Sequence, residues 1–203
     1  MAVLGFAYPE QNPGSPAPEA ARQETDFRED LYEWAGVVVF VLAFVVLLNA
    51  FVARQVVVSG PSMENTLQGG NRVLVSDFRY TPRQGDIVVL YATGIHTTII
   101  KRVAAVGGQT IDIDYAHNRV LVDGKTFSAP IKEPMQSIGA DGDGYGTLKL
   151  PLTVPEGDVF VLGDNRNISK DSRYAEVGLI PVQNLMGRVM LRIAPFTLFS
   201  RQM

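Results

Sequence analysis

The chain has 203 residues, enough for one substantial hydrophobic core and at most a small second subdomain. Its formal net charge of −3 and pI of about 5.4 exclude the basic footprint of a typical nucleic-acid-binding domain. Without cysteine, the chain has no thiol nucleophile, disulfide framework or thiolate metal site. The two histidines, His96 and His117, form no His-Glu-x-x-His pattern, so a zinc hydrolase is not expected.

The N-terminal region predicts a disordered tail over residues 1–30, rich in Pro, Ala, Gly, Gln and Glu, followed by a transmembrane helix over residues 31–54. The run from Trp34 to Ala53 carries no charge, and about 20 helical residues span the roughly 30 Å of bilayer hydrocarbon. A cleavable signal peptide and a buried core helix are the alternatives. The run is too long for the apolar part of a signal peptide, and the segment before it is acidic. The helix could also begin near Glu19 and extend into water.

The positive charges beside this helix do not orient it. Arg22 and Arg28 precede the apolar run, and Arg54 and Arg72 follow it. Because the cytoplasmic side normally carries an excess of Lys and Arg, this balance leaves the topology open.

The remaining residues, 55–203, predict a mainly β domain with an antiparallel sheet and a flexible excursion around residues 132–150. Short β-branched runs alternate with Gly and Pro, and helical periodicity is scarce. The pair Asp123-Gly124 predicts a two-residue hairpin turn. The expected strands are Gln55–Val58, Arg72–Ser76, Asp86–Tyr91, Thr97–Val106, Thr110–Asp114, Arg119–Val122, Asp158–Leu162 and Gly187–Ile193.

Ser62 lies in the turn Ser59–Met63, directly after the first expected strand. Gly and Pro are ordinary turn residues, so a serine in such a turn is by itself usually structural. A strand just before the turn would support the hydroxyl rigidly, and N–H groups in the turn can form an oxyanion hole. Pro61 has no N–H, which leaves Ser62 and Gly60 as the simplest donors.

Lys101 is the best candidate base for this serine. It lies in an otherwise apolar strand, where alternation sends Lys101 and Arg102 to opposite faces. A lysine loses its proton more easily when burial removes water from the charged form. The alternatives are a solvent-facing lysine that protects a sheet edge, and a triad that uses His96 or His117 as the base.

The loop from Gly163 to Arg173 combines acidic, basic and hydroxyl side chains. It is either a turn that satisfies its own polar groups or a support that lets Ser169 orient the lysine amine. In the second case the acids should pair with arginines, because a carboxylate beside Lys101 would raise its pKa.

Taken in order, these segments resemble the bacterial type I signal peptidases over residues 30–198. Ser59–Leu67 resembles the nucleophile box of that family, and Gln84–Val89 resembles the strand box that follows it. Lys101–Val103 resembles the general-base box, and Gly163–Arg173 resembles the most specific signature. The ordered set is far more specific than any single segment.

The resemblance implies Ser62 as nucleophile, Lys101 as general base, and Ser169 as hydrogen-bond partner of the lysine. Some family members carry a hydroxyl donor at the position of Gly60, and most carry proline at the position of Asn65. Neither is present here, which leaves the second oxyanion donor open, while activity is still expected. The residues implied as structural supports are Asp164, Arg166, Asp171 and Arg173.

The resemblance further implies a membrane-anchored serine endopeptidase of the Ser-Lys type that removes signal peptides from exported preproteins. Its partners would be those signal peptides and the lipid bilayer, with no cofactor, no metal and no nucleic acid. It would cross the cell membrane once, with its catalytic domain on the extracytoplasmic side. Two alternatives remain: a self-cleaving Ser-Lys protein of the LexA type, which lacks such an anchor, and an inactive tethered β module.

Overall fold

The computed structural model describes residues 19–51, 53–130, 133–136, 147–194 and 197–198. The chain divides into two compact units, one up to Leu47 and one from Leu48 onward. Residues 1–18 of the expected tail, and residues 137–146 of the expected excursion, lie outside the described residues.

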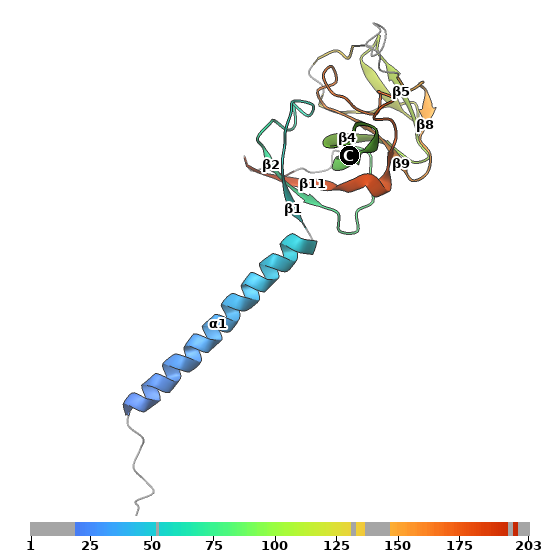
Figure 1. Ribbon diagram of the computed structural model, residues 1–203. Helices are drawn as coiled ribbons and strands as arrows, with labels where there is room; N and C mark the ends of the chain where they lie inside the picture. Colours follow the sequence, from blue (N-terminus) through green and yellow to red (C-terminus); the bar gives the residue numbers. More distant parts are fainter. Residues whose placement is uncertain (1–18, 52, 131–132, 137–146, 195–196, 199–203) are drawn as a thin grey trace, which may run out of the picture. The chain divides into compact units, whose positions relative to one another are not determined.

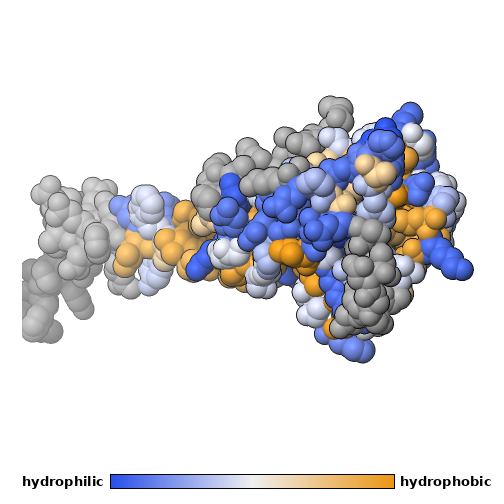
Figure 2. Space-filling model, turned by 90° about the horizontal axis from the view of Figure 1, so that it is seen from above, coloured by the Kyte–Doolittle hydropathy of each residue, from blue (hydrophilic) through white to orange (hydrophobic). Residues whose placement is uncertain are grey.

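The first unit contains most of a single helix, α1 (Glu19–Phe51), of 33 residues, whose last turn belongs to the second unit. It begins directly after Pro18 and runs through Ala, Glu and Arg, which favour helices, so it starts well before residue 31. Every side chain from Asp30 to Leu47 is exposed, and Figure 2 shows apolar side chains on the visible face of the helix. A helix that is apolar all round and unburied fits a lipid environment, as the sequence predicts.

The second unit is built on an antiparallel sheet with the strand order β1-β2-β11-β3-β4-β9-β10 (Figure 1). A short strand, β12, pairs with β11 outside this path. The strands of this sheet are β1 (Arg54–Val57), β2 (Arg72–Ser76), β3 (Ile87–Ala92), β4 (Thr97–Val106), β9 (Asp158–Leu162), β10 (Ile180–Pro181), β11 (Leu185–Ala194) and β12 (Thr197–Leu198).

A smaller antiparallel sheet has the order β7-β6-β5-β8. The turn between β6 and β7 is the one predicted from Asp123-Gly124: both residues have positive φ, 51° and 74°, as a type I′ turn requires. Val122 pairs with Lys125 across it, which confirms the hairpin. The strands are β5 (Thr110–Asp114), β6 (Arg119–Val122), β7 (Lys125–Thr126) and β8 (Leu152–Thr153).

The mainly β fold with one N-terminal helix is therefore confirmed. All eight expected strands are present, each within two residues of its expected bounds. The sequence did not indicate β8, β10 or β12, because a two-residue strand carries no alternating pattern.

The core of the large sheet holds the turn that follows β1. Met63 and Leu67 are completely buried there, against strand residues such as Val73 and Val89. The backbone N–H of Leu67 also donates to the Met63 carbonyl over 2.8 Å. The segment between β1 and β2 is thereby tied to the sheet, although it belongs to no strand or regular helix.

Candidate active site

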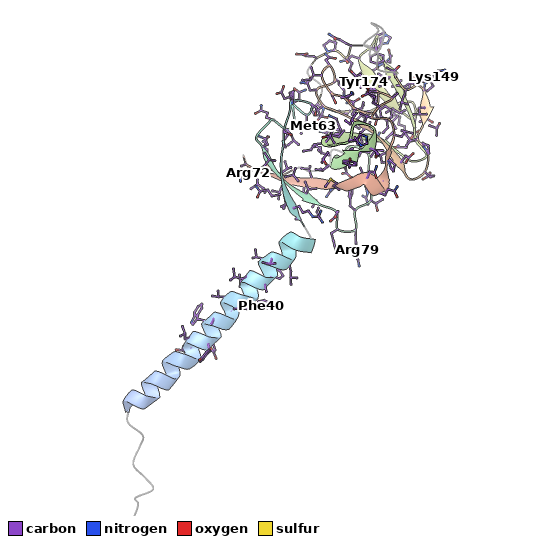
Figure 3. The ribbon with its side chains drawn as sticks, viewed as in Figure 1. Phe40, Met63, Arg72, Arg79, Lys149 and Tyr174 are labelled. Carbon is purple, nitrogen blue, oxygen red and sulfur yellow. The ribbon has the colours of Figure 1, made fainter. Side chains whose placement is uncertain are left out.

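Ser62 lies half-buried in this turn, directly before the buried Met63 (Figure 3). Gly60 has a φ of +82°, a left-handed conformation that glycine adopts without strain, and it turns the chain out of β1. Neither Gly60 nor Ser62 donates a backbone hydrogen bond to any described residue. Both expected oxyanion donors are therefore uncommitted within the described part of the chain.

The turn is fastened to the loop that follows β9. The Asn165 N–H donates to the Ser62 carbonyl over 3.1 Å. Thr66 donates its hydroxyl proton to the Asp164 carboxylate, 98 residues further along the chain, and the Asn65 amide lies 3.4 Å from the Asp164 carbonyl. The structure thus brings together the two segments that the sequence singled out.

Gly163 lies in close contact with the serine turn. A Cβ added to it would overlap the Ser169 hydroxyl and lie 2.6 Å from the Ser62 carbonyl oxygen. Glycine is required here by space, since its φ lies outside the positive range. Ser62 and Ser169 therefore flank one glycine.

Lys101 lies on β4 at the same place. Arg102 and Leu162 form the last pair of the ladder between β4 and β9, so Lys101 and Gly163 are the next residues along the two antiparallel segments. The side chain is only 2% exposed, so the alternative of a solvent-facing lysine at a sheet edge is wrong. Lys101 forms no hydrogen bond or ion pair with any described residue.

The pKa of Lys101 falls from 10.5 to about 8. Burial is the main cause, because it penalises the ammonium form, and the Arg173 charge acts in the same direction. The carboxylates of Asp171 and Asp164 raise the pKa but do not outweigh burial. A substantial fraction of the amine is consequently neutral in mildly alkaline solution.

Both carboxylates are committed to arginines, as the sequence predicted. Arg102, on the opposite face of β4, makes two hydrogen bonds to Asp164, of 2.8 and 2.7 Å. Asp171 binds Arg173 over 2.8 and 3.0 Å and accepts the Gly163 N–H over 2.9 Å. These contacts restrain both acids and moderate their effect on Lys101.

Arg102 is the supporting residue that the sequence analysis missed. The arginine that pairs with Asp164 comes from the strand β4 and not from the loop. The available signal was the position of Arg102 in an apolar strand: it is 8% exposed, and a buried guanidinium needs a carboxylate. Arg102 also donates to the Gly85 carbonyl over 2.8 Å.

The remaining supports hold the loop itself. The Arg166 Nε donates to the Gly163 carbonyl over 2.9 Å, and Arg173 donates to the Arg166 carbonyl over 2.5 Å. Burial raises the pKa of Asp171, but Arg173 and the other donors outweigh it, and the net pKa lies below the usual value. Asp171 therefore stays ionised across the physiological pH range.

The Ser169 hydroxyl is buried beside Gly163. It lies close enough to Asp171 to contribute to the low pKa of that acid, yet it makes no well-formed hydrogen bond among the described residues. The bond to Lys101 that the resemblance implied is thus not formed in this structure. A buried hydroxyl without a partner is uncommon, and it remains available to a nearby donor or acceptor.

The two histidines lie elsewhere. His96 has a left-handed conformation in the β3–β4 connection, and His117 binds Asp114 over 2.8 Å in an exposed turn of the small sheet. Neither forms a hydrogen bond with Ser62. In the described ranges, His, Asp and Glu also form no group suited to a metal ion.

Residues 31–194 match the model of the family described as signal peptidase, peptidase S26. The chain belongs to this family. It is 30% identical over 182 residues to signal peptidase I of Bacillus licheniformis, covering 86% of this chain and 94% of that protein. It is 37% identical over 161 residues to signal peptidase I V of Bacillus subtilis (strain 168), covering 75% and 92%.

Signal peptidase IB of Staphylococcus aureus (strain Mu50) is 31% identical over 187 residues, covering 85% of this chain and 94% of that protein. A crystal structure of a signal peptidase I from Enterococcus faecalis V583 shares 26% identity and a TM-score of 0.42, covering 54% of this chain and 97% of that one. Membership of this peptidase family implies a serine peptidase.

Proposed function

We propose that this member of the signal peptidase family removes signal peptides from exported preproteins by means of a Ser62–Lys101 dyad. The observation that carries the proposal is the position of Lys101, a buried amine without a partner where Gly163 separates Ser62 from Ser169. Outside a catalytic site, an unpaired buried lysine would only weaken the fold.

The reaction follows from these positions. Neutral Lys101 accepts the hydroxyl proton as the Ser62 oxygen attacks the carbonyl carbon before the scissile bond. The Ser62 N–H stabilises the negative oxygen that forms. The lysine ammonium then gives its proton to the departing amine, which leaves an ester on Ser62. A water molecule then gives a proton to Lys101 and attacks this ester. Lys101 returns that proton to the Ser62 oxygen, and the cleaved signal peptide leaves as a carboxylic acid.

Ser169 is proposed to position the lysine amine. Its hydroxyl is buried, lacks a well-formed hydrogen bond and borders the same glycine as Ser62. Catalytic hydrogen bonds are often long in a free enzyme and shorten when substrate binds. An apolar signal peptide over the site would also exclude water and lower the lysine pKa further.

The substrate is proposed to bind as an added strand. β9 pairs with β4 only from Arg102 onward, so among the described residues the β4 edge from Thr97 to Lys101 is paired with β3 alone. A peptide extended along this edge would bring its backbone to the lysine amine. Two shallow apolar pockets would accept the small side chains of an Ala-x-Ala-like sequence.

The proposed location is the cell membrane, with a single span and the β unit on the extracytoplasmic side. Support comes from the uncovered apolar surface of α1 and from family membership. In this setting the anchor keeps the enzyme near membrane-bound preproteins at a high effective concentration.

The deciding experiment is preprotein cleavage by the full chain, with Ser62→Ala compared with Ser59→Ala. Ser59 is an exposed serine of the same turn, so the two changes remove the same group from neighbouring positions. Ser62→Ala should abolish cleavage and labelling by an acylating serine-protease probe, whereas Ser59→Ala should retain both. More than a few per cent of wild-type cleavage in Ser62→Ala would overturn the assignment and favour an inactive binding module or another nucleophile.

A further inference from the structure

A cavity of the β unit lies away from the candidate active site, beside the loop that joins β2 to β3. Its volume is about 370 Å³, and its lining includes Arg79, Arg83 and Arg188 but no carboxylate. Such a concentration of positive charge contrasts with the net charge of −3 of the whole chain. The cavity therefore has the electrostatic character of an anion site.

Two of the three guanidinium groups are available to a ligand. Arg188 lies 3.5 Å from Asp86, which partly neutralises it. Arg79 and Arg83 are exposed and form no ion pair with any described residue. Arg79 instead lies over the ring of Phe78, 5.6 Å from its centre.

Phe78 adds an apolar group to the rim of this charged cavity. It is 63% exposed, so its ring is accessible to a lipid. An aromatic ring beside arginines suits the boundary of a bilayer, where apolar and charged groups meet the same surface.

The first charged residue after the apolar run lies near this cavity within the β unit. Arg54 begins β1 shortly after α1 ends at Phe51, and it is the first charged residue after the apolar run. Its Cα partner in β2 is Val75, directly before Ser76 in the cavity lining. The Cα atoms of Arg54 and Ser76 are therefore separated by one spacing between strands plus one residue along β2, which is at most about 10 Å. The headgroup layer is itself roughly 5–8 Å deep, so the cavity is within reach of it.

We propose that Arg79 and Arg83, with Arg188 beside them, bind the phosphate group of an anionic phospholipid, with Phe78 among the adjoining lipid groups. The site holds the β unit at the membrane surface, where membrane-bound substrate arrives. This inference rests on the membrane anchor of the proposed function, but not on the Ser62–Lys101 chemistry.

The test uses the full chain purified in a neutral detergent. Phosphatidylglycerol or phosphatidylcholine with identical acyl chains is added, and bound lipids are counted by native mass spectrometry. Wild type should retain phosphatidylglycerol preferentially. Arg79→Gln/Arg83→Gln should lower that preference by about fivefold for each arginine lost, while phosphatidylcholine retention stays unchanged.

The matched control is Lys125→Gln/Lys149→Gln, which removes two exposed positive charges from the region of the small sheet. Figure 3 shows Lys149 and Arg79 at well-separated places on the β unit. The control should keep the wild-type lipid preference. If both double variants lost the preference for phosphatidylglycerol equally, the preference would depend on the overall charge of the protein, and the proposed site would be wrong.

Two other results would also overturn the lipid assignment. One is equal retention of the two lipids by wild type. The other is displacement of phosphatidylglycerol by millimolar inorganic phosphate, which would make free phosphate the ligand. The membrane anchor itself is tested separately: if α1 does not span the membrane, alkaline carbonate should release the chain from membranes. Neither the lipid measurement nor the carbonate extraction depends on peptide cleavage.

Discussion

The backbone N–H of Asn165 donates a hydrogen bond of 3.1 Å to the carbonyl oxygen of Ser62. This bond holds the serine turn against the loop that contains Ser169. Because it joins two backbones, its geometry depends on the loop conformation. The supporting ion pairs of that loop therefore determine where the serine lies relative to Lys101.

Replacing Lys101 should abolish cleavage but stabilise the fold. The change in pKa from 10.5 to about 8 corresponds to about 3 kcal/mol at 1.36 kcal/mol per pH unit. Lys101→Met keeps much of the side-chain volume without the buried charge, so its unfolding free energy at pH 7 should exceed that of wild type. Lys101→Arg should be inactive, because a guanidinium stays protonated. Substantial turnover by Lys101→Arg would exclude the lysine as base.

The stability difference between Lys101→Met and wild type should depend on pH. Between pH 8 and 10.5 the unfolded lysine is largely protonated and the folded one is largely neutral, so wild-type stability rises with pH. The advantage of Lys101→Met should be largest below pH 8 and disappear near pH 10.5. Denaturant unfolding of both proteins across this range measures it, and a constant difference would contradict the low pKa.

The cleavage rate should follow the same group. Only the neutral amine accepts a proton, so kcat/KM should rise with pH through an apparent pKa of about 8. His96→Ala and His117→Ala should leave this rise of kcat/KM with pH unchanged. A limb near pH 6.5 that vanishes with either histidine would instead support a histidine base.

Ser169→Ala should slow cleavage without abolishing it. One orienting hydrogen bond contributes about 1–3 kcal/mol, which corresponds to roughly ten- to a hundredfold in kcat. If the Ser169 hydroxyl binds the Lys101 amine, the apparent pKa at which kcat rises with pH should also shift. Wild-type kcat with an unmoved pH profile would show that Ser169 is only structural.

Gly163→Ala should be far more damaging than Gly69→Ala. The added methyl group would collide with Ser169 and the Ser62 carbonyl, whereas nothing lies within 4 Å of a Cβ at Gly69. Cleavage rates and thermal unfolding of the two variants test the contact between the two segments. Equal behaviour would mean that the serine turn and the loop are not packed as described.

The family proline should not be tolerated at position 65. Asn65 has a φ of +95°, far from the value near −65° to which proline is restricted, and Asn readily adopts positive φ. Asn65→Pro should lower the melting temperature and the cleavage rate, while Asn65→Gly, which permits this φ, should retain most of both. An Asn65→Pro variant equal to wild type would show that the turn adopts another conformation.

Local signals were sufficient for much of the fold. The hairpin at Asp123-Gly124 was predictable because two adjacent residues with positive φ restrict the turn type. The short strands β8, β10 and β12 were not, because they exist only through pairing with distant partners. The early start of α1 was left open, since helix-forming residues before a membrane segment are compatible with either a tail or a longer helix.

The residue types and order of the candidate site were also readable: a serine in a turn, a lysine in an apolar strand, and a polar loop that resembles one family. These are properties of local sequence, which specifies chemistry and alternation along the chain. The burial of Lys101, the pairing of Arg102 with Asp164 and the contact of Gly163 with both serines were decided only by tertiary structure. The pKa of an amine and the partner of an ion depend on what packs around them, and here those neighbours come from segments far apart in the sequence.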